Sequence, residues 1–198
     1  MLSKLQIEQL VFAEANEREL QTELKKDLSI LAEVYAIPKD EFIAFSEFPV
    51  GDGCVDFVIF TSRSRMKIIL IEVKGADFTF STKAGAVAEG INFAAQQLRE
   101  RFYTILSSYE SFRRNAHLIR RSVEAGHQKY NSLPSSGLKG GRLLVDSEKD
   151  IDVSGVVIGG RTRDDLLESK LKFQMGSSSN PYIIYESWDS WLRKLTRP

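Results

Sequence analysis

Asp56, Glu72 and Lys74 have the side-chain types and the spacing of a metal-dependent hydrolytic site. Fifteen residues separate Asp56 from Glu72, and a single residue separates Glu72 from Lys74. Two carboxylates can share one divalent cation, which activates a water molecule and holds a phosphate group. Oxygen ligands without a thiol favour Mg²⁺ or Mn²⁺ over Zn²⁺. Because an ammonium group beside them can steer the water or stabilise developing negative charge, the pattern predicts a phosphodiesterase site.

The two carboxylates lie in segments whose composition predicts β-strands. Residues 55–60 and 67–74 are rich in β-branched and aromatic side chains, and a polar turn separates them. A hairpin centred on Ser64 would place Asp56 opposite Glu72, with both side chains on the same face of the sheet. Their Cβ atoms would then lie about 5 Å apart, within reach of one cation.

Glu72 and Lys74 could instead form an ordinary ion pair on a solvated strand face. The residues that precede the charges on the same predicted faces are apolar, namely Val58, Phe60, Ile68 and Leu70. A solvated face would not carry them, which favours acids at the open end of a buried face. From the hairpin alone, both interpretations remain open.

Helices and strands along the chain must position these residues. Residues 3–35 contain strong helix formers without Gly or Pro, which predicts one long amphipathic helix, or two, ending before Pro38. Residues 84–124 carry an apolar stripe at helical spacing, with a break near Ser107 or later. The other predicted elements are strands at 42–48, 142–145, 155–159 and 182–185, and helices at 163–173 and 188–195.

This order of elements predicts an α/β fold with a mixed sheet covered by helices on both faces. The first three strands would form an antiparallel meander, followed by a helix and a further strand. We expect one domain over residues 1–198, with an N-terminal helical segment at 1–36 and an α/β core at 40–198. Residues 125–154 form a long connection rich in Gly, Ser and Lys, and such loops are usually functional or mobile.

The composition indicates which partners and which cellular compartment to expect. The chain has 27 Lys and Arg against 27 Asp and Glu, so its formal net charge is zero and it is not a uniformly basic nucleic-acid coat. Cys54 is the only cysteine, which favours a reducing cytoplasm. No window approaches about 20 uninterrupted apolar residues, so we expect a cytoplasmic protein without membrane insertion.

Residues 53–60 and 69–75 together resemble the motif of the PD-(D/E)XK nuclease superfamily. Its core consists of a helix, a three-stranded meander, a helix and a strand. More narrowly, the chain is similar to the nuclease domain of the Shedu anti-phage defence proteins. The similarity extends to four further segments, at 17–24, 95–98, 156–161 and 182–195. The resemblance implies a restriction-endonuclease-like core and metal-dependent cleavage of DNA, most simply as an endonuclease in anti-phage defence.

The resemblance also implies roles for individual residues. Asp56, Glu72 and the Val73 carbonyl would bind Mg²⁺ or Mn²⁺, and Lys74 would orient the attacking water. An acid of the first helix would complete the site, and both Glu17 and Glu19 fit. Glu17 is favoured because it shares the helix face of Leu20, Leu24 and Leu31, whereas Glu19 points away from that face. The family glutamine would be Gln97 rather than Gln96, because Gln97 lies nearer the apolar stripe and is followed by Leu98.

Positive charge is concentrated on the helical region after the meander, with Arg99, Arg101, Arg113, Arg114, Arg120 and Arg121. Such a run is usually a solvated face, but DNA phosphates also need cations. Arg101 and Arg161, the latter at the end of a predicted strand, are therefore candidate DNA contacts. Since cleavage of both strands needs two sites, we expect a homo-oligomer. The alternative function is an inactive nuclease-fold module for nucleic-acid binding or assembly.

Overall fold

A computed structural model describes residues 2–198, which form seven α-helices, a short 3-10 turn and six β-strands. The helices are α1 (Lys4–Phe12), α2 (Glu17–Leu24), α3 (Ser29–Tyr35), α4 (Glu89–Ser107), α5 (Tyr109–Glu124), α6 (Asp165–Ser177) and α7 (Trp188–Leu192). The strands are β1 (Phe42–Val50), β2 (Gly53–Thr61), β3 (Lys67–Val73), β4 (Leu133–Pro134), β5 (Asp152–Ile158) and β6 (Ile183–Glu186), and the 3-10 turn is η1 (Lys139–Gly141).

The strands form one open sheet in the order β4-β1-β2-β3-β5-β6. β1 runs antiparallel to β2 and to β4, whereas β5 and β6 are parallel, so the prediction of a mixed α/β sheet flanked by helices is confirmed. Most of the strand composition is β-branched or aromatic, which suits a pleated surface buried on both faces. β5 shows this directly, because its last four residues, Gly155 to Ile158, are all buried.

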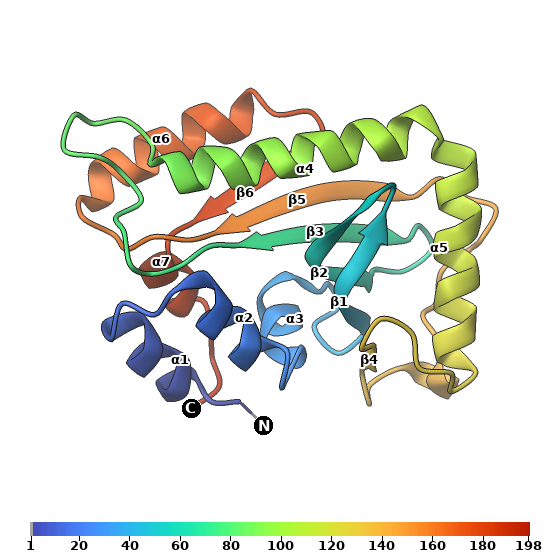
Figure 1. Cartoon of the computed structure of the whole chain (residues 1–198). Coiled ribbons are helices and arrows are strands. Elements are labelled where there is room, and N and C mark those ends of the chain that lie inside the picture. The colour runs from blue at the N-terminus through green and yellow to red at the C-terminus, as the bar shows by residue number, and fades with distance from the viewer. Residues whose placement is uncertain (1) are drawn as a thin grey trace. The chain divides into compact units, whose positions relative to one another are not determined.

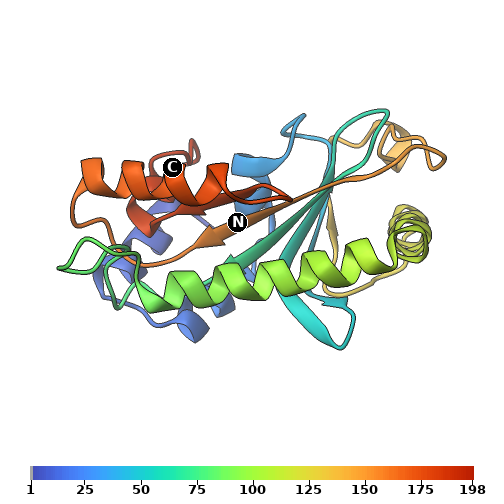
Figure 2. The ribbon, with the colours of Figure 1, turned by 90° about the horizontal axis from the view of Figure 1, so that it is seen from above.

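The chain divides into two compact units. The first contains residues 2–27, Ile71–Arg99 and Gly155–Pro198, and the second contains Leu28–Leu70 and Glu100–Ser154. In the first unit, α6 packs along β6, and α1 contacts both α2 and α7 (Figure 1). The first half of α4 and the helix α6 lie on opposite sides of β5, so helices cover both faces of the strands (Figure 2). The apolar residues of this half of α4, Ile91, Ala94, Ala95 and Leu98, are buried as the predicted stripe requires.

The N-terminal segment forms three short helices instead of the one or two that we predicted. Asn16 is the N-cap of α2. Its side chain accepts a hydrogen bond from the Glu19 N–H (3.1 Å), and the Glu19 side chain accepts one from the Asn16 N–H (2.9 Å). This reciprocal capping box starts α2 and separates it from α1. Glu14 has a φ of 54°, a left-handed conformation that interrupts helical geometry. α3 then begins at Ser29.

In the second unit, β1 and β2 form an antiparallel pair with Phe45 opposite Val58. Phe45, Phe48 and Phe60 pack with ring centroids 4.8 to 5.6 Å apart, which anchors the pair in the core. The predicted break after Ser107 is confirmed, because α4 ends there and α5 starts at Tyr109. Among the described residues, no helix is long and apolar enough to cross a membrane.

The strand predicted at residues 142–145 was wrong. Only an isolated bridge joins Val145 to Ser64 there, and the short strand of this connection is β4, which pairs with Ile43 and Ala44 of β1. Gly140 and Gly141 have φ angles of 62° and 72°, so a left-handed turn precedes the segment and prevents a longer extended run. Smaller differences concern helix bounds, since α4 starts at Glu89 and α6 continues to Ser177.

His117 on α5 is buried, with an exposed fraction of 2%. Neither imidazole nitrogen has a hydrogen-bond partner among residues 2–198. Burial, together with the positive charges of Arg120, Arg121 and Arg113, lowers the pKa of His117 to about 4, against an opposing effect of Asp146. The folded protein therefore holds His117 in its neutral form at pH 7.

We expect His117 to make the protein less stable in acid. Between about pH 6.5 and pH 4 the unfolded chain binds a proton that the folded chain does not, so the free energy of unfolding falls as the pH falls. The contribution is at most about 1.4 kcal/mol per pH unit. Urea unfolding at pH 7, 6 and 5 should show His117→Leu gaining stability relative to the wild type as the pH falls. A difference between the two proteins that does not change with pH would contradict this.

Candidate active site

Three of the predicted site residues line one cavity in the first unit. The cavity has a volume of about 800 Å³, and its lining includes Glu17 at the start of α2, Lys74 just after β3 and Gln97 on α4. These residues come from three segments that are far apart in the sequence. The fold therefore brings an acid, an ammonium group and an amide to one open cavity.

Lys74 and Glu17 form an ion pair at this cavity. Lys74 Nζ donates to Glu17 Oε1 at 3.1 Å, and the Gln21 amide donates to the same oxygen at 3.3 Å. The Lys74 side chain is only 10% exposed, whereas that of Glu17 is 43% exposed. The carboxylate thus balances the charge of a nearly buried ammonium group and limits its orientation.

The backbone of Lys74 is fixed on both sides. Its N–H donates to the Ile158 carbonyl of β5 at 2.8 Å, and its carbonyl accepts from the Trp188 indole N–H at 2.9 Å. Gly159 approaches so closely that a Cβ atom there would lie 2.7 Å from the Lys74 Cβ. These contacts hold the base of the lysine side chain rigidly, which is what a positioned catalytic group needs.

A second set of backbone contacts places Glu17 beside Lys74. The Ala76 N–H donates to the Ala15 carbonyl at 2.8 Å, which ties the segment after β3 to the segment before α2. Gly75 allows the close approach, because a Cβ atom there would lie 3.2 Å from the Glu17 nitrogen and 2.2 Å from an Asp77 oxygen. Glu17 is the first residue of α2, where the helix dipole also favours a carboxylate.

The structure distinguishes the two candidate acids of the first helical segment. Glu17 faces the cavity and Lys74, whereas the exposed Glu19 is held in the capping box with Asn16. Similarly, Gln97 lines the cavity, and Gln96 is exposed. The Gln97 Oε1 atom is buried and has no hydrogen-bond partner among residues 2–198. Of the pairs Glu17/Glu19 and Gln96/Gln97, Glu17 and Gln97 are therefore the residues placed to contact a ligand in the cavity.

Substituting the two glutamates gives a matched test of this assignment. We expect Glu17→Gln to lower single-turnover cleavage by up to about a hundredfold, because the ammonium group of Lys74 loses its charged partner and its fixed orientation. Glu19→Gln should leave the rate unchanged, because glutamine can complete the same capping box. Equal rates for the two variants would show that the ion pair with Lys74 does not contribute to catalysis.

Glu72 and Val73 end β3, directly before Lys74. The exposed fractions are 2% for Glu72, 0% for Val73 and 8% for Lys74. An ordinary ion pair on a solvated strand face is therefore excluded for Glu72 and Lys74, and Lys74 pairs with Glu17 of α2. The end of β3 and the residue that follows it therefore carry a buried carboxylate and a nearly buried ammonium group, a costly arrangement that often marks a functional site.

Asp56 lies on β2 in the second unit and is half-buried. Thr61 ends β2 three residues before Ser64, and Lys67 begins β3 three residues after it, as a hairpin centred on Ser64 requires. That Asp56 faces Glu72 stays a prediction. In residues 2–198, no group of three or more His, Cys, Asp or Glu side chains has the arrangement of a metal site. The predicted ligands are two carboxylates and one carbonyl, all of them oxygen donors suited to a hard cation.

Sequence reasoning missed other residues of the cavity, of which Phe93 and Asp77 have the side chains most relevant to its chemistry. Phe93, which is 60% exposed, has its ring centroid 5.6 Å from Lys74 Nζ, a cation–π distance. Asp77 also lines the cavity, three residues after Lys74. Phe93 could have been noted as an aromatic residue one helical turn before Gln97, on a helix already predicted.

The two arginines predicted to contact DNA have different environments. Arg161 donates through Nε and Nη2 to Asp189 at 3.0 to 3.2 Å and through Nη1 to the Val11 carbonyl at 2.9 Å. Burial would raise the pKa of Asp189, but hydrogen bonds from Arg161 and the Thr162 N–H lower it below its usual value. Arg161 thus joins the end of α1 to α7.

Arg101, in the second unit, is half-buried, and its guanidinium group lies against Gly53, the first residue of β2. A Cβ atom at Gly53 would lie 2.1 Å from an Arg101 nitrogen. A phosphate contact by either arginine stays a prediction.

Comparison with known proteins identifies the family of this chain. The profile of the family described as Shedu protein SduA, C-terminal, matches residues 14–192. No curated protein matches the sequence. The matched range includes all of the residues predicted for the site, from Glu17 to Arg161. The chain therefore belongs to the family of the C-terminal region of the Shedu protein SduA.

Proposed function

We propose that the chain is an Mg²⁺-dependent DNA endonuclease. The observation that carries the proposal is the convergence of Glu17, Lys74 and Gln97 on one cavity, together with the burial of Glu72 two residues before Lys74. Membership of the Shedu family implies a role in anti-phage defence, and the family is associated with defence nuclease activity. Hydrolysis of DNA phosphodiester bonds is the reaction that unites this role with the groups in the cavity.

The metal would be held by the carboxylates of Asp56 and Glu72 and by the Val73 carbonyl. These donors fit Mg²⁺ or Mn²⁺, which accept oxygen ligands and keep several water molecules. When bound, such an ion supplies Lewis acidity and a water of lowered pKa. The same donors offer no thiol or imidazole that would favour Zn²⁺.

The side chains of the cavity would position the other reactants. Lys74 would donate a hydrogen bond to the attacking water or to a phosphate oxygen that gains negative charge. Glu17 would hold the ammonium group in place through the 3.1 Å ion pair. The Gln97 amide would orient water or substrate, and the exposed ring of Phe93 would contact a sugar or base at the cavity mouth.

The direct test is cleavage of purified DNA. Supercoiled plasmid and linear DNA would be incubated with the protein, with and without Mg²⁺, and with EDTA added to the Mg²⁺ sample. We expect cleavage only with free Mg²⁺. Salt-dependent binding of DNA without cleavage would instead support the alternative function, an inactive nuclease-fold module for nucleic-acid binding or assembly.

We also expect the protein to form a homo-oligomer. One chain carries a single proposed metal site, and attack on both strands of a duplex is achieved most simply by two sites related by two-fold symmetry. Light scattering at micromolar concentration should give a mass of at least two chains. A monomer that still makes double-strand breaks would contradict the expectation.

A further inference from the structure

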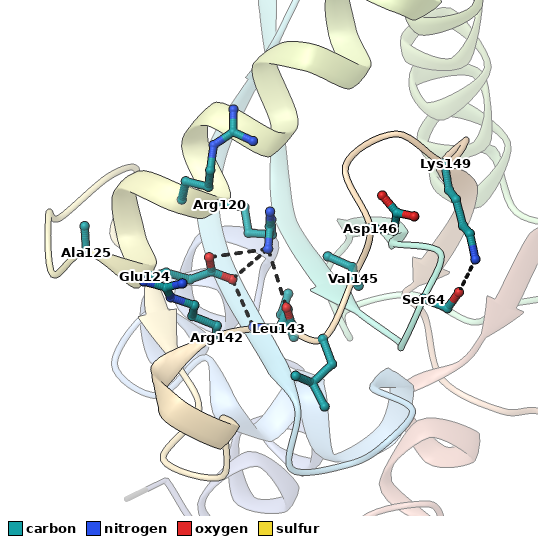
Figure 3. Close-up of a pocket in the computed structure, with 11 residues that line it drawn as sticks. Ser64, Arg120, Glu124, Ala125, Arg142, Leu143, Val145, Asp146 and Lys149 are labelled. Atoms are coloured by element: carbon teal, nitrogen blue, oxygen red, sulfur yellow. Dashed lines mark hydrogen bonds and ion pairs between the residues drawn. The ribbon is translucent and has the colours of Figure 1, made fainter.

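The second unit contains a cavity of about 740 Å³ that the proposed nuclease function does not use. It lies between the C-terminal half of α5 and the loop of residues 142–149 (Figure 3). The loop belongs to the long Gly-, Ser- and Lys-rich connection, and the helix carries the arginine-rich run of the sequence. Two features that the sequence singled out therefore meet in one recess.

Positive charge predominates in this cavity, although the whole chain has no net charge. Its lining contains four cations, Arg120, Arg121, Arg142 and Lys149, and two carboxylates, Glu124 and Asp146. Because a chain with equal numbers of acids and bases keeps an excess of bases here, the cavity attracts anions.

Arg120 and Glu124 neutralise each other at the inner wall. Arg120 Nη1 lies 3.1 Å from Glu124 Oε1, and the two side chains are only 8% and 5% exposed. Glu124 Oε1 also accepts the Leu143 N–H at 2.9 Å, so this carboxylate is fully engaged. The Arg120 Nε–H is buried and has no acceptor within residues 2–198. This pair therefore forms a rigid inner wall in which the Arg120 Nε–H is the donor that lacks an acceptor in the described part of the chain.

Within residues 2–198, three of the four lining cations have no carboxylate partner. The exposed side chains of Arg121 and Arg142 make no ion pair or hydrogen bond with the described residues. Lys149 Nζ donates only to the Ser64 hydroxyl, at 2.7 Å, so its charge is not balanced by a carboxylate. Asp146 is the one acid that opposes anion binding, and its Oδ1 accepts the Glu148 N–H. Among the described residues, the lining therefore has three cations without a carboxylate partner and one carboxylate, that of Asp146, without a cation partner.

The loop that forms the outer wall is fixed before any ligand arrives. The Ser64 N–H donates to the Leu144 carbonyl at 2.7 Å, and the Asp146 N–H donates back to the Ser64 carbonyl at 2.8 Å. Arg113 Nη1 holds the Ser147 carbonyl at 2.5 Å. A preorganised wall reduces the entropy lost on binding, which favours a ligand site over a loose surface loop.

The lining also has an apolar part, which narrows the class of ligand. Ala125, Leu143, Leu144 and Val145 lie among the charged groups, and Leu144 is 46% exposed. The cavity volume is within the range of small-molecule sites, about 300 to 1,000 Å³. A protein that binds the DNA backbone usually carries an exposed stripe of cations along the path of the phosphates. A recess that combines cations with apolar side chains suits a small molecule with one phosphate group and one ring.

We propose that this cavity binds a free mononucleotide. Arg121 and Arg142 grip its phosphate group, because guanidinium groups form paired hydrogen bonds with phosphate oxygens. Lys149 lies on the opposite side of the recess from Arg142, beside Ser64, so its charge adds to the positive potential of the cavity and not to the phosphate grip (Figure 3). The base packs on Leu144 and Val145. The site is independent of the cleavage reaction, since none of its residues lines the cavity that contains Lys74.

The test is titration calorimetry of the full chain in a magnesium-free buffer at fixed salt. The ligands are each of the four ribonucleoside 5′-monophosphates, the corresponding nucleosides, inorganic phosphate, and an unphosphorylated 12-nucleotide DNA. At least one monophosphate should bind once per chain, and its nucleoside and inorganic phosphate should each bind at least tenfold more weakly. Arg121→Ala and Arg142→Ala should each weaken binding by roughly tenfold or more.

Arg114→Ala is the matched control. Arg114 is an exposed arginine of the same helix that does not line the cavity, so its removal changes the net charge equally. Binding by this variant should equal that of the wild type, and circular dichroism should show all variants folded. The proposal is overturned if no monophosphate binds folded wild-type protein at millimolar concentration, if Arg114→Ala weakens binding as much as Arg142→Ala, or if only the oligonucleotide binds.

Discussion

Glu72→Gln and Asp56→Asn should each reduce DNA cleavage at least about a thousandfold. Each substitution removes a charged oxygen ligand from the proposed metal site, and metal ions contribute several kcal/mol to stabilising transition-state charge, where about 1.4 kcal/mol corresponds to a factor of ten. In EDTA, both variants should unfold at the wild-type temperature or above it, because they remove a like-charge interaction between the carboxylates. Cleavage assays with Mg²⁺ and thermal unfolding in EDTA measure the two effects.

Glu168→Gln is a suitable control for the loss of a buried carboxylate. Glu168 is 3% exposed, pairs with Lys172 at 2.6 Å and accepts a hydrogen bond from the Ser187 hydroxyl at 2.7 Å, and none of these three residues lines the cavity. Its replacement should lower the unfolding temperature but leave cleavage intact at temperatures where the protein is folded. If Glu72→Gln cleaved DNA as well as Glu168→Gln does, the metal-ligand role of Glu72 would be wrong.

Much of the fold could be predicted because the periodicities in the sequence are strong. The stripe from Ile91 to Ile105 has helical spacing, and its members are buried along α4. The strands β2, β3 and β5 are short apolar runs between turn residues, so their existence and type follow from composition. Such segments are predictable because their local structural preference agrees with their burial in the fold.

The N-terminal helices were harder to predict because uniform helix formers conceal their ends. The signal was present as Asn16 followed three residues later by Glu19, a capping-box pattern inside a run that otherwise reads as continuous helix. The strand predicted at residues 142–145, between α5 and β5, was wrong for a different reason. The segment near Val145 is held by single contacts to Ser64, which no local periodicity encodes.

The candidate site was predictable in its residue types and only partly in its contacts. Lys74 follows a recognisable strand, but its partner depends on the hydrogen bond between Ala76 and Ala15, which joins segments about sixty residues apart. That tertiary contact selects Glu17 over Glu19. Arg161 illustrates the limit, because Asp189, which engages it, lies 28 residues further along the chain.

Lys74→Ala should lose most of the cleavage rate while it retains metal binding. If the acids hold the ion and Lys74 acts only on water or on the charge that develops, its removal should cost about 100- to 10,000-fold in the chemical step. Lys74→Arg should not restore activity, because the larger guanidinium group cannot act as the same compact donor in a site bounded by Gly159. Single-turnover cleavage gives the rates, and Mn²⁺ titration calorimetry gives the affinity for metal.

A double-mutant cycle then assigns the loss to the ion pair. If Glu17 acts only through Lys74, Glu17→Gln should lower the rate in the wild-type background but not in the Lys74→Ala background. A further loss in the double variant would mean that Glu17 contacts the metal or the substrate by itself. Should Lys74→Ala cleave at the wild-type rate, the pair at 3.1 Å would be structural only, because a group that acts in the transition state cannot be removed without slowing the reaction.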